Sequence, residues 1–142
     1  MMKSSRFALL ATLVLLPAFA HAQMAKLTVV VSGIAPATGT VEVSVFNTAE
    51  TFMQKPLLQQ SRNVSGLTET KFVFAGLLEG NYAVVVVHDE NGNGVRDAGF
   101  LGFGGESYAY SNDASSWLGR PSFEDASFTV AKEDMEILIG LE

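Results

Sequence analysis

The 142-residue sequence contains no cysteine, two histidines and one tryptophan, and fifteen acidic residues outnumber nine basic ones. Without cysteine the chain has no disulfide, no thiolate metal ligand and no thiol nucleophile. Without clusters of Lys and Arg, nucleic acid and anionic membrane surfaces are unfavourable partners. The excess of acidic residues gives the chain a formal net charge of −6, which favours the attraction of cations.

The first 22 residues have the pattern of an export signal. Lys3 and Arg6 form a basic start, residues 7–20 are mostly apolar, and residues 20–22 read Ala-His-Ala, which fits a cleavage site. The alternative is an uncleaved anchor helix, but the apolar run is shorter than the roughly 20 residues that a membrane span needs. We therefore expect a signal peptide at 1–22, no membrane span after cleavage, and a periplasmic or secreted protein.

The rest of the chain, residues 23–142, predicts a single domain of short strands. Alternating or continuous apolar residues place strands at 27–31, 41–45, 71–74, 82–87, 128–130 and 135–141. Segment 82–87 is apolar on both faces, which predicts a central strand. Segment 47–60 predicts a short helix or an ordered loop, because Asn47 and Glu50 have the spacing of a capping box.

These segments predict an all-β fold, an immunoglobulin-like β-sandwich of about seven strands with at most one short helix. A long Gly/Asn/Asp-rich loop follows the central strand and extends to about residue 125. A loop of that length is typically functional or disordered.

The start of this loop has the spacing of a calcium-binding motif. Oxygen-bearing side chains at alternate positions, followed by Gly94 at the sharp turn, match the first half of an EF-hand loop. The predicted ligands are Asp89, Asn91, Asn93, the carbonyl of Val95, Asp97 and, from farther along the chain, Glu106. Phe100 stands where an EF-hand has its last Glu, and a strand leads into the loop. The alternative is an ordinary turn, because Asp, Asn and Gly are also common turn residues.

Several stretches resemble a family of small secreted bacterial proteins catalogued as domain of unknown function 2141. They are Phe74-Ala-Gly-Leu-Leu-Glu-Gly-Asn-Tyr-Ala83, His88-Asp-Glu-Asn-Gly-Asn-Gly94, Phe100-Leu-Gly102 with Glu106, Tyr110-Ser-Asn112 and Arg120-Pro-Ser-Phe-Glu-Asp-Ala-Ser-Phe128. The resemblance extends over almost all of residues 26–141. It implies export and a β-sandwich similar to prealbumin-like or carboxypeptidase-regulatory-like domains, and it implies no established activity.

A second hypothesis concerns the aromatic residues of the 100–120 loop. Tyr108, Tyr110 and Trp117 could contact a carbohydrate, a surface polymer or a protein, or they could pin the loop to the sandwich.

No catalytic constellation is visible in the sequence. His88 has no nucleophile at a fixed spacing from it, and Glu124 and Asp125, expected on a strand, would point to opposite faces. We therefore expect a non-enzymatic protein, with a small hydrolase that uses His88 or scattered carboxylates as the remaining alternative. The sequence does not specify the oligomeric state.

Overall fold

The computed structural model describes residues 23–94, 105–115 and 119–141. The predictions for the signal peptide, Val95, Asp97, Phe100 and Trp117 lie outside these residues. Within them, no helix is long and apolar enough to cross a membrane.

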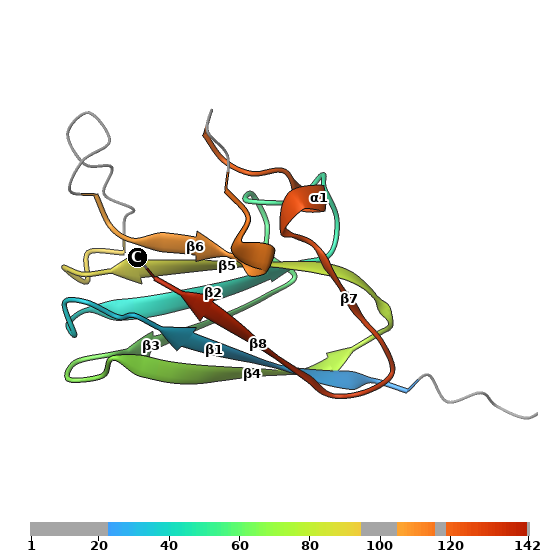
Figure 1. Cartoon of the computed structure of the whole chain (residues 1–142), viewed down its shortest axis with the longest axis horizontal. Coiled ribbons are helices and arrows are strands. Elements are labelled where there is room, and N and C mark those ends of the chain that lie inside the picture. Colours follow the sequence, from blue (N-terminus) through green and yellow to red (C-terminus); the bar gives the residue numbers. More distant parts are fainter. Residues whose placement is uncertain (1–22, 95–104, 116–118, 142) are drawn as a thin grey trace, which may run out of the picture.

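Two β-sheets pack against each other, which confirms the predicted sandwich (Figure 1). The three-stranded sheet has the order β4 (Glu69–Leu77), β1 (Ala25–Ser32) and β8 (Met135–Gly140). The five-stranded sheet has the order β3 (Leu58–Asn63), β2 (Thr40–Phe46), β5 (Gly80–Asp89) and β6 (Tyr108–Tyr110), and β7 (Phe128–Val130) pairs with the start of β5. Among the strand pairings of the described residues, that of β1 with β8 alone is parallel.

The main core lies between the two sheets. Every second residue of a strand points to the same face, and these residues are aliphatic or aromatic in β1, β2, β4 and β5. The fully buried members include Leu27, Val29, Val31, Val41, Val43, Val45, Phe72, Phe74, Val84 and Val86. Residues 27–31, 41–45, 71–74, 82–87 and 128–130 are all strand, as predicted, and the last predicted strand, 135–141, ends one residue earlier, at Gly140.

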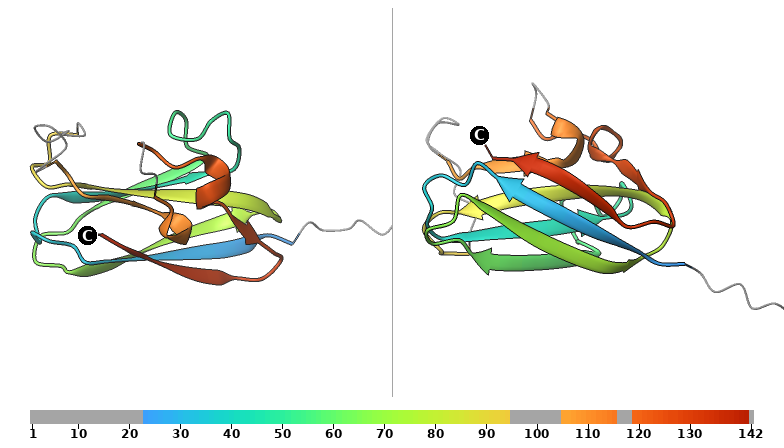
Figure 2. Two further views of the ribbon diagram at one scale, coloured as in Figure 1. Left: turned by 45° about the horizontal axis from the view of Figure 1, so that its top comes forward. Right: turned by 60° about the horizontal axis from the view of Figure 1, so that its bottom comes forward.

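A smaller apolar cluster covers part of the outer face of the five-stranded sheet. Two short helices, η1 (Ser111–Asp113) and α1 (Phe123–Ala126), lie on this side of the molecule (Figure 2). The buried members are Phe46, Phe52, Ala83, Val85, Tyr110 and Ala126. Both faces of β5 are therefore buried along most of its length, and its prediction as a central strand is confirmed.

Of the two alternatives predicted for segment 47–60, the structure shows the ordered loop and not the short helix. It contains turns and then the start of β3, and the Thr48 hydroxyl, rather than Asn47, accepts the Thr51 N–H. The capping box occurs instead at α1, where Ser122 and Asp125 bond each other's backbone N–H. Glu124 and Asp125 thus lie in a helical turn, not on a strand.

Candidate functional site: an acidic hollow beside the loop after β5

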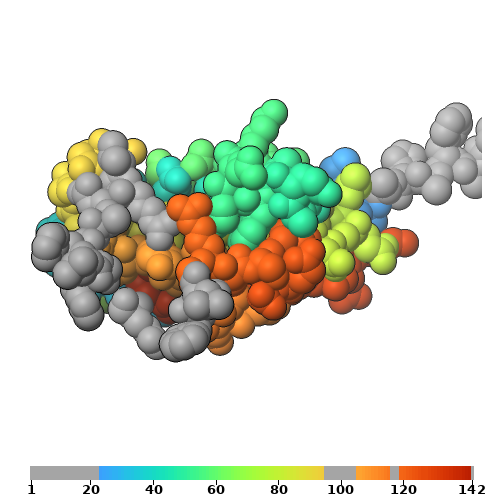
Figure 3. All heavy atoms as spheres, turned by 90° about the horizontal axis from the view of Figure 1, so that it is seen from above, coloured from blue at the N-terminus to red at the C-terminus, as the bar shows by residue number. Residues whose placement is uncertain are grey.

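An acidic hollow lies at the end of the five-stranded sheet, beyond the apolar cluster on the same outer face. In Figure 3, residues 119–127 cover the middle of this face, and the loop after β5 (yellow) lies at one end. The hollow has a volume of about 440 Å³. Its lining residues are Thr40, Glu42, Ser61, Val87, Asp89, Gly92, Gly94 and Glu106.

Strand register explains how these side chains meet. In the pairing of β2 with β5, Thr40 is opposite Asp89. On the other side of β5, the His88 N–H donates to the Ser107 carbonyl over 2.9 Å, which extends the β5–β6 ladder by one pair. The next pair in this register is Asp89 and Glu106. Paired residues point to the same face of a sheet, so the two carboxylates lie on the same side.

Asp89 organises the loop that follows it. One carboxylate oxygen accepts the N–H groups of Gly92 (2.7 Å) and Asn93 (3.2 Å), and the other accepts that of Gly94 (2.7 Å). The Gly94 N–H, together with those of Gly92 and Asn93 and with the Glu106 side chain, lowers the pKa of Asp89 below its ordinary 3.8, although partial burial opposes the shift. Gly92 and Gly94 both have positive φ, near 70°, which glycine adopts without steric cost. Asp89 is therefore ionised at neutral pH.

Asp89 and Glu106 also hydrogen-bond each other through their side chains. Glu106 is only 8 % exposed. Two carboxylates that lie close together repel each other when both are ionised, and a proton or a cation between them would offset this repulsion. A carboxylate has about four lone-pair sites, and the three backbone N–H groups leave Asp89 with capacity for such a contact.

The structure brings together part of the predicted ligand set. Asp89 and Glu106 meet in the hollow, whereas the Asn91 side-chain oxygen accepts the Asn93 N–H over 2.9 Å and so stabilises the turn. Val95 and Asp97 lie outside the described residues. Among residues 23–94, 105–115 and 119–141, no three His, Cys, Asp or Glu side chains are close enough to hold a metal ion.

Sequence reasoning missed the lining residues Thr40, Glu42 and Ser61. The alternation of Glu42 with Val41 and Val43 does place Glu42 on a wet face. Only the register of β2 between β3 and β5, with Glu42 opposite Ser61 and Val87, places it in the hollow.

His88 points away from this site. Its side chain is fully buried between the sheets, and its Nε2 donates to the Thr38 carbonyl over 2.7 Å. Consecutive strand residues face opposite sides, so His88 and Asp89 are not brought together. Nδ1 is buried with no hydrogen-bond partner among the described residues. A histidine in this position lies inside the core, away from solvent.

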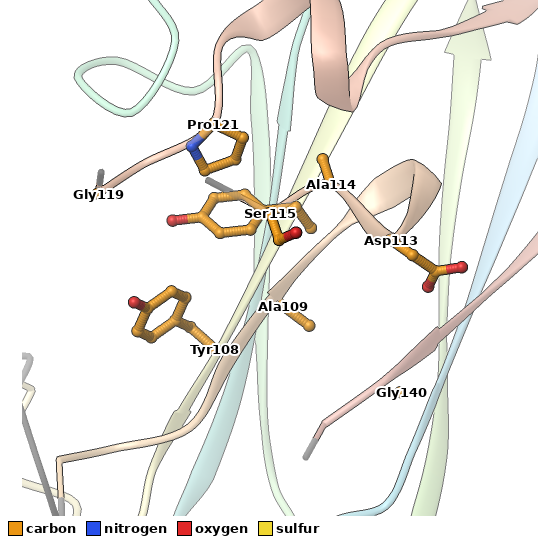
Figure 4. Close-up of a pocket in the computed structure, with 9 residues that line it drawn as sticks. Tyr108, Ala109, Asp113, Ala114, Ser115, Gly119, Pro121 and Gly140 are labelled. Atoms are coloured by element: carbon orange, nitrogen blue, oxygen red, sulfur yellow. The ribbon is translucent and has the colours of Figure 1, made fainter. Parts of the chain in front are cut away.

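A second hollow, of about 300 Å³, lies beside β6 and η1 (Figure 4). Its lining residues are Tyr108, Ala109, Tyr110, Asp113, Ala114, Ser115, Gly119, Pro121 and Gly140. The Tyr108 ring is 44 % exposed and stands edge-on to the buried ring of Tyr110, with 5.7 Å between their centroids. Of the predicted aromatic set, Tyr108 is thus accessible and Tyr110 pins the segment to the sheet.

The hydroxyl of Ser111 is used structurally. It accepts the Val84 N–H over 2.8 Å and donates to the Ala126 carbonyl, and the side chain is only 2 % exposed. Ser111 therefore links β5 to α1, and its hydroxyl is not available as a nucleophile.

The protein is therefore a β-sandwich, and its candidate site is the acidic hollow beside the loop that follows its central strand, β5. Residues 29–138 match the model of the family described as an uncharacterized protein conserved in bacteria, domain of unknown function 2141, and the chain belongs to this family. No curated protein and no solved structure matches the chain.

Proposed function

We propose that this protein is an exported, non-enzymatic β-sandwich that binds a calcium ion at the loop after β5. The observation that carries the proposal is the contact between the Asp89 and Glu106 carboxylates in a hollow that Glu42 also lines. Calcium prefers six to eight oxygen ligands in flexible geometry. The motif spacing adds Asn91, Asn93, Val95 and Asp97 as further oxygen donors.

A calcium ion would lie between the carboxylates of Asp89 and Glu106. Both carboxylates could then be ionised together, because the divalent charge offsets their repulsion. The competing interpretation is a carboxylate pair that shares a proton and closes an ordinary turn.

The test is the melting temperature of the protein in about 1 mM calcium and in excess chelator. A site with a Kd of about 10 μM would stabilise the fold by about 2.7 kcal/mol, which raises the melting temperature by several degrees. We expect Asp89→Asn and Glu106→Gln to abolish the calcium-dependent rise. The matched control is Asp113→Asn, an exposed acid of the other hollow, which should keep it. An equal response to magnesium, or no rise at all, would refute the proposal.

The Tyr108 hollow supports a second candidate function, the binding of a carbohydrate or a protein surface. An exposed ring in a hollow that Asp113 and Ser115 also line combines a stacking surface with hydrogen-bonding groups. Tyr108→Ala should reduce retention on immobilised glycans at an unchanged melting temperature. Loss of retention in Asp89→Asn alone would instead place the binding surface at the acidic hollow.

A further inference from the structure

The outer edge of β8 has backbone groups that point away from its only partner strand. The Leu141 N–H donates to the Ser32 carbonyl on β1 over 2.9 Å. Because backbone groups alternate in direction along a strand, Ile139 and Ile137 also face β1, and the N–H and C=O groups of Glu136, Leu138 and Gly140 face the edge. Within the described residues, β8 pairs with β1 alone. A sheet edge of this kind is a template for another strand.

The edge is also apolar. Leu138 is 67 % exposed, the highest value among the exposed large hydrophobic side chains of the described residues. It continues the row of Lys71 and Val30 on the outer face of the three-stranded sheet. Glu136 is the one charged side chain of β8, and its ion pair with Lys71 leaves the middle of the edge, at Leu138, without the charge that normally protects an edge strand.

A hollow of about 260 Å³ follows the inner side of the same edge. Its lining residues are Ser111, Asn112, Asp113, Phe128, Ile137 and Leu138. A strand added to β8 would direct every second side chain toward this hollow. An aliphatic residue would fit there, against Ile137 and Phe128.

The sequence of β8 fits its own edge. With two copies antiparallel about a two-fold axis at Leu138, the edge-facing residues pair as Leu138 with Leu138 and Glu136 with Gly140. Ile139 of each copy then faces Ile137 of the other, at the hollow, and within β8 itself no like charges are opposed. The neighbouring charges on this face are already paired, Lys71 with Glu136 over 3.4 Å and Lys26 with Asp134 over 3.0 Å. These pairs offset the charges of Glu136 and Asp134, whereas Asp113, which lines the hollow, adds an acidic group beside the edge.

We propose that β8 is the self-association edge of the protein, where two copies join their three-stranded sheets antiparallel at Leu138. A C2 interface of this kind is isologous, so the same patch serves both copies. A pairing of six residues buries less than the roughly 800 Å² per partner of stable complexes, so we expect a weak, concentration-dependent dimer.

Sedimentation equilibrium of the purified protein, from about 10 μM to about 1 mM, tests this proposal over the range of weak affinities. We expect the average mass to rise toward that of a dimer. Leu138→Lys should keep the protein monomeric, because it places two like charges at the two-fold axis. The matched control is Leu78→Lys, since Leu78 is also exposed (50 %) but lies outside β8, and it should still dimerise.

Hydrogen exchange supplies a second measurement that does not depend on variants. The Leu138 amide should exchange more slowly as the protein concentration rises. A monomer at every concentration, or equal loss of association in Leu78→Lys and Leu138→Lys, would overturn the proposal. Protection of the Leu138 amide only after another polypeptide is added would also overturn it, and would assign the edge to a foreign strand.

Discussion

The outer faces of the two sheets differ in what covers them. On the five-stranded sheet, η1, α1 and the turns after β2 bury an apolar cluster at one end and leave an acidic hollow at the other. On the three-stranded sheet, the outer face has exposed apolar residues such as Val73 and Leu138 between paired charges. The segment between β5 and β7 thus gives only one of the two faces a layer that can shape a site.

The largest expected effect follows from removal of an aromatic ring under this layer. Phe46 is 3 % exposed and stands edge-on to Phe52, with 5.4 Å between the ring centroids. Phe46→Ala should lower the free energy of unfolding by about 3–5 kcal/mol, because it loses buried area and leaves a cavity. Urea denaturation measures this change.

The matched substitution on the other face is Val73→Ala. Val73 is 48 % exposed, and such a substitution should change the free energy of unfolding by less than about 0.5 kcal/mol. Similar losses for the two variants would mean that the outer layer contributes no core of its own.

A smaller effect is expected from the hydroxyl that ties this layer to β5. Ser111→Ala leaves the buried Val84 N–H and the Ala126 carbonyl without their partner, which should cost about 1–3 kcal/mol. Hydrogen exchange of the Val84 amide should accelerate at the same time. The control is Ser115→Ala, because Ser115 is exposed. If both variants unfold at the wild-type urea concentration, Ser111 does not anchor the layer.

Much of the sandwich was predictable because the strands that form its core are strongly apolar. The missed strand β3 reads Leu-Gln-Gln-Ser-Arg-Asn and has no apolar alternation. It forms because β2 offers it a partner, and because its polar side chains reach β4: Gln60 donates to the Val73 carbonyl over 2.8 Å, and Arg62 donates to Thr70 over 3.2 Å. Strand β6 has only three residues and also depends on pairing. Sequence periodicity cannot reveal either case.

The candidate site was likewise predictable only where its residues are close together in the sequence. Asp89 follows from the local motif, since its partners Gly92, Asn93 and Gly94 are within five residues. Glu106 was proposed only as the nearest later carboxylate. Its position opposite Asp89, and that of Glu42, depend on the registers of three different strands. Long-range register of this kind is set by tertiary pairing.

The smallest expected effect concerns the pKa values of two aspartates, one near each sheet. Asp134 and Asp89 both have a pKa below 3.8, but for different reasons: Lys26 lowers the pKa of Asp134 through its side chain and its backbone N–H, whereas backbone N–H groups of its own loop lower that of Asp89. A lowered pKa stabilises the folded state above the ordinary pKa of the group, and this stability is lost as the pH falls through the folded-state value. Acid should therefore weaken both regions below about pH 4.

High salt should change the pKa values of the two aspartates by different amounts. The Lys26–Asp134 ion pair is solvent-exposed, and ions at about 1 M screen charges beyond about 3 Å. Backbone hydrogen bonds to Asp89 depend on contact geometry and are screened less. In a carboxylate NMR titration with excess chelator, the pKa of Asp134 should rise toward its ordinary value in high salt, and that of Asp89 should rise less. Equal rises would mean that long-range charge, rather than the N–H groups of the loop, holds Asp89 ionised, and the loop would then not be preorganised around its carboxylate.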